Sequence, residues 1–148
     1  MKAFLDIGFL LTLLLKTNGS PKAWEIARGL DGPLALASFQ IFNIENRLQR
    51  QIEADDSTSA DRAVAANALQ NFRWYLDQQV LRPIRLDYDI AIDLASQWQK
   101  QSRTTLPAFL LLWPALAATT GATHFLSFDP RPRQLARAAG MKLLPERL

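Results

Sequence analysis

The chain has 148 residues, 49% hydrophobic and 21% charged, a composition typical of one folded domain and not of a disordered segment. It has no cysteine and one histidine, His124, which excludes disulfides, thiolate metal sites and multi-histidine zinc sites and fits a cytoplasmic location. The formal net charge of +3 favours an anionic partner such as RNA only weakly, because the basic residues are scattered.

The apolar stretch near the N-terminus predicts a core strand followed by a buried helix. A secretory signal is the alternative, but Asp6 puts a charge inside the stretch and no small-x-small cleavage site follows it. The run is also too short to span a bilayer, so we expect no membrane association. We therefore expect a strand over 3–5, ending at Asp6, and a helix over 9–15.

The next segments carry clear start and stop signals. The Ser-Pro pair at 20–21 predicts a helix that ends near residue 30, where Asp-Gly-Pro at 31–33 stops it. Residues 34–37 form a second short apolar strand, and Ser38 is a candidate N-cap for the helix after it. Two further helices are expected in this half of the chain, over 39–54 and 60–79.

The second half of the chain continues the alternation of strands and helices. Pro83 within the apolar run 80–86 predicts a third strand at a sheet edge, because proline donates no ladder hydrogen bond. Asp87 is a candidate N-cap, and the apolar stretch 106–120 predicts a buried helix closed by Gly121. The other expected elements are a helix over 88–101, a strand over 123–128, a helix over 130–139 and a strand over 141–144.

Short strands alternating with helices predict an α/β fold, a mostly parallel sheet with helices on both faces. In such sheets ligands bind beyond the carboxyl ends of the strands. Asp6 ends the first strand, Asp129 follows the fourth, and Glu45 lies on the helix after the second. If the first and fourth strands are neighbours, these carboxylates face one crevice. There they would bind Mg²⁺ or Mn²⁺, which would activate water to attack a phosphodiester.

Each of these acids also has a purely structural interpretation. Asp6 can cap the next helix, and Asp129 can begin a turn before the proline that follows it. Glu45 can pair on the helix surface with Arg47 or Gln49. The pattern alone leaves both interpretations open.

Four segments resemble the PIN-domain family of VapC-like toxin ribonucleases, in the same order and with similar spacing. The run 4–11 looks like the family's opening strand followed by an aspartate, and 38–50 resembles the helix that carries its glutamate. The most specific similarity lies in 121–129, which ends in the family's strand-end aspartate, and in 134–140. The resemblance covers essentially the whole chain, as a single PIN-like domain over 1–148.

The resemblance implies a three-layer α/β/α sandwich with about five strands in the order 3-2-1-4-5, which makes the first and fourth strands neighbours. It also implies a metal-dependent endoribonuclease whose catalytic and metal-binding residues are Asp6, Glu45 and Asp129, with Mg²⁺ or Mn²⁺ as cofactor. RNA, an antitoxin-like protein and a second copy of the chain in a homodimer are the implied partners. Three aromatic residues, Trp24, Trp74 and Tyr75, are candidates for a partner-facing patch, with packing in the core as the alternative.

The departures from the family pattern concern the same site. Ile7 and Gly8 stand where the family has a hydroxyl residue and a small polar one, and Leu110 and Trp113 stand where it has an aspartate and a histidine. The acidic group 87–93 does not replace the lost aspartate, because its helix precedes the affected one. We therefore expect weak binding of one metal ion and little or no RNA cleavage.

Three functional hypotheses follow. The chain is a metal-dependent ribonuclease, a non-catalytic PIN-like module that binds RNA or protein, or an inactive toxin homologue that still binds an antitoxin.

Overall fold

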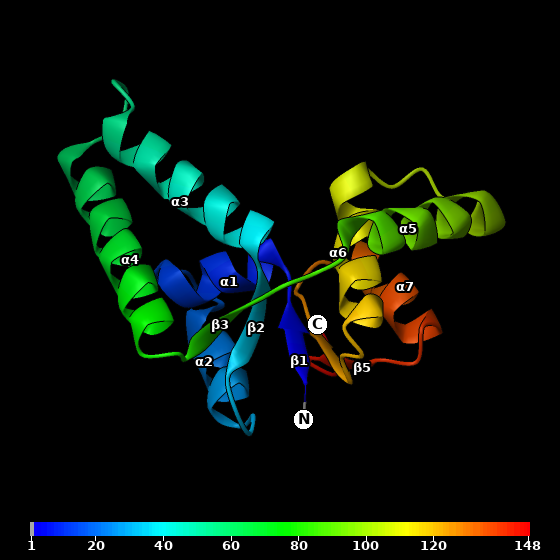
Figure 1. The fold of residues 1–148 in the computed structure, drawn as a ribbon. Coiled ribbons are helices and arrows are strands. Elements are labelled where there is room, and N and C mark those ends of the chain that lie inside the picture. Colours follow the sequence, from blue (N-terminus) through cyan, green and yellow to red (C-terminus); the bar gives the residue numbers. More distant parts are fainter. Residues whose placement is uncertain (1) are drawn as a thin grey trace.

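The computed structural model describes residues 2–148, and they contain one five-stranded parallel sheet (Figure 1). The strands lie in the order β3-β2-β1-β4-β5, which confirms the order expected from the family resemblance. The strands are β1 (Ala3–Leu5), β2 (Leu34–Ala37), β3 (Leu81–Ile84), β4 (His124–Leu126) and β5 (Lys142–Leu144).

Helices cover both faces of the sheet, which confirms the three-layer α/β/α architecture. The helices are α1 (Ile7–Leu14), α2 (Ser20–Arg28), α3 (Ser38–Glu53), α4 (Ser59–Asp77), α5 (Tyr88–Ser102), α6 (Ala108–Thr119) and α7 (Pro130–Ala138). Helices α1 to α4 share one apolar core with the sheet, and α5 to α7 share the other (Figure 1). Among the helices of residues 2–148, none is both long enough and apolar enough to cross a membrane.

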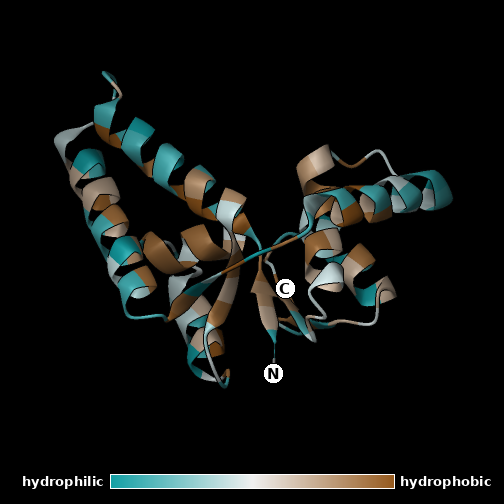
Figure 2. Cartoon of the chain, in the orientation of Figure 1, coloured by the Kyte–Doolittle hydropathy of each residue, from teal (hydrophilic) through white to brown (hydrophobic). Residues whose placement is uncertain are grey.

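The central strand β1 shows why the sheet needs two helix layers. Ala3 and Leu5 point into the core of α1 to α4, and Phe4 points into the core of α5 to α7. All three side chains are buried, as expected for a parallel strand covered on both faces. Figure 2 shows the same division along the helices, since hydrophobic residues gather near the sheet and hydrophilic ones at the far ends of α3 and α5.

The structure corrects several of the expected helix starts. Ser20 is the first residue of α2, and Gly19 takes the N-cap position. Helix α1 begins at Ile7, two residues earlier than expected, because the Asp6 carboxylate accepts the N–H of Phe9 at 2.6 Å and caps the first turn. Ser38 is not the N-cap of α3 but its first residue. Ala37 takes the N-cap position, and the Gln40 side chain accepts its N–H at 2.8 Å.

The third strand is shorter than the expected 80–86, and it lies at the edge of the sheet as Pro83 predicted. Asp87 caps α5 by accepting the N–H groups of Asp89 and Ile90, as expected. Helix α6 begins only after Pro107, and Gly121, with φ of +67°, follows its C-terminus.

Candidate functional site

The carboxyl ends of β1 and β4 form the candidate site, because these strands are direct neighbours with Leu5 opposite Leu126. Asp6 follows β1 immediately, and Asp129 lies three residues beyond β4. The N–H of Asp6 donates to the carbonyl of Leu126 at 3.0 Å, which ties the start of the site to β4. The expected adjacency of the two strand ends is therefore present.

Asp6 is buried, with 4% of its surface exposed. Burial raises the pKa of Asp6 from 3.8 to about 6, and the charge of Asp129 adds to this rise. Hydrogen bonding from the Ser127 side chain and the Phe9 N–H acts in the opposite direction on the same pKa. The carboxyl group is thus oriented by the first turn of α1 and by Ser127, although the family's hydroxyl is missing at Ile7.

Asp129 is held by an arginine two residues along the chain. Arg131 Nε lies 2.9 Å from Oδ1 of Asp129, and Arg131 Nη2 lies 2.6 Å from Oδ2. The guanidinium therefore donates hydrogen bonds to both carboxylate oxygens. The backbone N–H of Arg131 also donates to Oδ1 at 2.9 Å, which makes Asp129 the N-cap of α7. These hydrogen bonds lower the pKa of Asp129 and occupy the lone pairs that a metal ion would need.

Glu45 is directed towards α4. Its Oε1 lies 3.5 Å from Nε of Arg73, and 40% of its side chain is exposed. The buried row of α3 is formed by Gln40, Ile44 and Leu48, which fixes the rotation of the helix. Glu45 therefore pairs across the contact between α3 and α4.

These carboxylates do not fit a divalent metal ion as they are arranged. Within residues 2–148, no three acidic, histidine or cysteine side chains are grouped so that they could hold a metal. Two of the expected ligands, Glu45 and Asp129, are paired with arginines. Mg²⁺ is commonly held by one or two carboxylates together with waters, and among residues 2–148 only Asp6 of the three is free of an arginine partner.

Aromatic rings lie beside the positions where the family carries its further polar residues. Trp113 is buried and stacks on Phe109 at 6.0 Å, and Phe109 stacks on Phe39 at 5.7 Å. Phe42 and Phe109 are 62% and 52% exposed. We call Phe39, Phe42, Phe109 and the neighbouring Tyr88 the aromatic patch. Together with Ser38 and Leu112 they line a shallow hollow of about 480 Å³.

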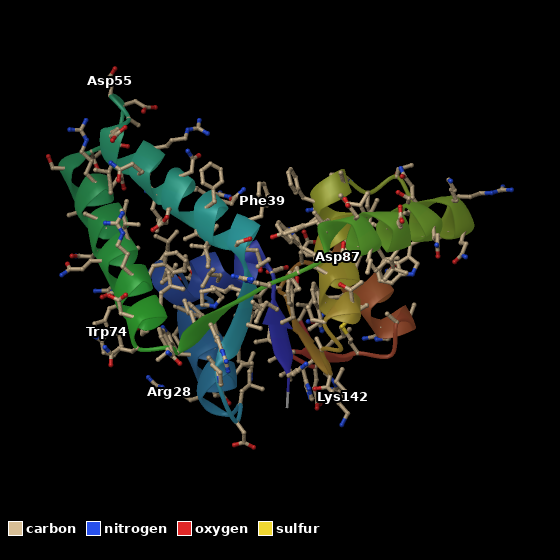
Figure 3. The ribbon with its side chains drawn as sticks, viewed as in Figure 1. Arg28, Phe39, Asp55, Trp74, Asp87 and Lys142 are labelled. Carbon is tan, nitrogen blue, oxygen red and sulfur yellow. The ribbon has the colours of Figure 1, made fainter. Side chains whose placement is uncertain are left out.

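The aromatic patch joins the N-terminal ends of α3 and α6. Figure 3 shows Phe39 at the end of α3 nearest the sheet, with Asp87 at the start of α5. Sequence reasoning missed this patch, although the spacing of Phe39 from Phe42 and of Phe109 from Trp113 places each pair on one helix face.

Gln40 is a second residue that sequence reasoning missed. It is fully buried, and its Nε2 donates to the carbonyl of Leu5 at 2.6 Å while its Oε1 accepts from Ala37. These two bonds fix the start of α3 against the end of β1. A polar amide on the buried stripe of the predicted helix was the available signal.

Of the three aromatic residues that are candidates for a partner-facing patch, two pack against the core and one is exposed. Trp24 and Tyr75 pack against the core of α1 to α4, with ring centroids 5.5 Å apart, and Trp74 is 55% exposed and meets Tyr75 edge-on at 5.3 Å. Beside them, between α1, α2 and α4, lies a groove of about 370 Å³ lined by Leu10, Leu13, Leu14, Trp24, Arg28 and Tyr75.

No family model and no curated protein matches the sequence. Solved structures match the fold over nearly the whole chain. A chain of VapBC2 from Rickettsia felis, in a structure bound to a DNA fragment from the promoter, matches with a TM-score of 0.68 and 11% identity, over 97% of each chain. A chain of FitAcB from Neisseria gonorrhoeae matches with a TM-score of 0.67 and 12% identity, also over 97% of each chain. The chain therefore has the PIN-like fold of VapC-type toxins that its sequence resembles.

Proposed function

We propose that this chain is a VapC-like protein of a toxin–antitoxin pair that binds an antitoxin-like protein and has lost metal-dependent ribonuclease activity. The state of the three candidate acids carries the proposal. Asp129 is held by Arg131, Glu45 is paired with Arg73, and Asp6 is buried with a raised pKa. A metal ion would have to displace two arginine side chains before it found three ligands.

The partner follows from the structures that share this fold, VapBC2 and FitAcB, which are toxin–antitoxin assemblies. The surface we assign to it is the groove between α1, α2 and α4, together with the exposed ring of Trp74 beside it. Arg28 lies over the ring of Trp24 at 5.9 Å, so aromatic and arginine side chains stand together. Such residues are enriched among those that dominate the binding energy of protein interfaces. Figure 3 shows Trp74 and Arg28 on the same side of the molecule.

The test of the partner is co-expression of the full chain with the product of any small reading frame that lies directly upstream of its gene. We expect a complex that survives gel filtration, and Trp74→Ala should weaken it by roughly tenfold or more. Ile92→Ala is the control, since it removes a similarly exposed large apolar side chain from α5. Absence of a complex, or equal losses from both variants, would contradict the assignment.

The test of the lost activity is an RNA cleavage assay with Mn²⁺ on structured RNA, comparing the native chain with Asp6→Asn and Leu110→Asp. We expect no cleavage above background from the native chain or from either variant, because Leu110→Asp leaves both arginine pairs in place. Cleavage by the native chain that Asp6→Asn abolishes would establish the ribonuclease instead.

A further inference from the structure

Part of the sheet on the side of α5 to α7 lies outside the helix layer. The strand register places Phe4, Ala35 and Arg82 side by side in one row on this face. The apolar core of that side includes Phe4 but neither Ala35, which is half-buried, nor Arg82, which is exposed. Figure 1 shows the chain after β3 running in front of the other strands to the start of α5. The uncovered row forms the base of a cleft of about 760 Å³.

The floor and the rim of this cleft differ in chemistry. The floor is apolar and is formed by Ala35 and Ile84, with Phe4 fully buried beside Ala35 in the same row. Ala35 keeps it open, because its methyl group is the only side chain between Phe4 and Arg82 in that row. The lining also includes Lys2 and Pro33, which precede β1 and β2, so the cleft reaches the end of these strands opposite to Asp6.

The rim is positively charged. Lys2 lines the cleft from the segment before β1, Arg82 and Arg85 line it from β3 and the residues after it, and Asp87 is its one acidic residue. The carboxylate of Asp87 is already committed, because it accepts two backbone N–H groups at the start of α5. Within residues 2–148, neither arginine forms a salt bridge or a hydrogen bond through its side chain. Lys2 donates only to the carbonyl of Thr120, at 3.3 Å.

We infer that this cleft binds a small phosphate-bearing ligand with a flat apolar part, that is, a nucleotide. Guanidinium groups present planar donors that match phosphate oxygens, and two of them stand free here beside a lysine. The volume lies within the range of small-ligand sites, roughly 300–1,000 Å³, and the apolar floor offers a surface on which a base can lie. An added peptide strand fits less well, because Pro83 lies in the edge strand and interrupts its hydrogen bonding.

This site is independent of the proposed partner surface and of the paired acids. Its test is calorimetric titration of the full chain with AMP and, separately, with inorganic phosphate. AMP should bind more tightly than phosphate, since only AMP reaches the floor. The Arg82→Gln/Arg85→Gln double variant should weaken AMP binding by more than roughly tenfold, because two charge-assisted contacts are lost.

Two further variants test whether AMP binds in the cleft or is attracted only by the net positive charge of the chain. The Arg47→Gln/Lys100→Gln double variant removes the same net charge from exposed positions on α3 and α5, and should change AMP affinity by less than about twofold. Ala35→Leu fills the floor and keeps every cation, so it should weaken AMP binding more than phosphate binding. Thermal unfolding of each variant checks that it is folded. No binding of either probe, equal losses in both double variants, or AMP no tighter than phosphate would overturn the inference.

Discussion

Replacing Asp6 with asparagine tests whether burial of this carboxyl group destabilises its ionised form in the folded protein. Burial raises its pKa from 3.8 to about 6, so between these pH values the folded state holds a proton that the unfolded chain releases. One pKa unit corresponds to about 1.4 kcal/mol. The shift therefore corresponds to about 3 kcal/mol of stability, fully present below about pH 4 and lost as the pH rises through about 6.

The asparagine variant keeps an acceptor oxygen for the N–H of Phe9 and cannot ionise. We expect it to be about as stable as the native chain near pH 4 and more stable by up to about 3 kcal/mol near pH 8. Urea unfolding followed by tryptophan fluorescence at a series of pH values measures both curves. The control is Asp55→Asn in the exposed loop between α3 and α4 (Figure 3), which should show little difference at any pH. An Asp6→Asn variant that is less stable than the native chain near pH 8 would refute this reasoning.

Three further predictions concern single side chains. Gln40→Leu should lower the free energy of unfolding by about 2–4 kcal/mol, because two buried backbone groups lose their hydrogen-bond partners. Gln49→Leu, on the exposed face of α3, should change the free energy of unfolding little. Urea unfolding measures both values. The homodimer expected from the resemblance should form through the aromatic patch, which contains the exposed Phe42. Sedimentation should therefore show a monomer for Phe42→Glu and a dimer for Trp74→Glu. A dimer for Phe42→Glu and a monomer for Trp74→Glu would contradict this interface. Arg131→Ala should raise the pKa of the carboxyl group that it holds, measured by NMR titration, and an unchanged pKa would show that the ion pair does not form in solution.

The arrangement of the sheet could be predicted because its signals are local. The apolar run at 3–5 ends at Asp6, and the run at 123–128 precedes Asp129, so both acids could be assigned to strand ends. Their adjacency required the strand order, which came from the family resemblance. Pro83 marked the edge strand correctly, because the missing N–H of proline excludes it from a central position.

The geometry of the candidate site could not be predicted, because it depends on contacts between distant segments. The direction of Glu45 is set by the rotation of α3 and by Arg73, which belongs to the next helix. The hydrogen bonds from Arg131 to Asp129 depend on the backbone geometry of the first turn of α7. The Asp-Pro pair in the sequence predicts that a turn begins there, but not where the Arg131 side chain lies. Hydroxyl residues usually fill the N-cap position, which favours Ser38 in the sequence. In the structure Ala37 is the N-cap, and the buried amide of Gln40 accepts its N–H.

Only part of the aromatic patch could be predicted from the sequence. Phe39 and Phe109 are far apart in the chain, and only the packing of α3 beside α6 stacks their rings. Helical spacing shows that Phe109 and Trp113 share a face, but not whether that face is buried or open. In the structure it is both, since Trp113 is buried and Phe109 is half exposed.

Titration of the native chain with Mn²⁺, followed by electron paramagnetic resonance of the free ion, tests most directly whether the paired acids still form a metal site. Because Asp129 and Glu45 are held by arginines and no group of three ligands is present in residues 2–148, we expect no binding tighter than about 1 mM. Binding of one Mn²⁺ per chain with a Kd of about 10 μM or below, abolished by Asp6→Asn, would contradict the proposed loss of the metal site.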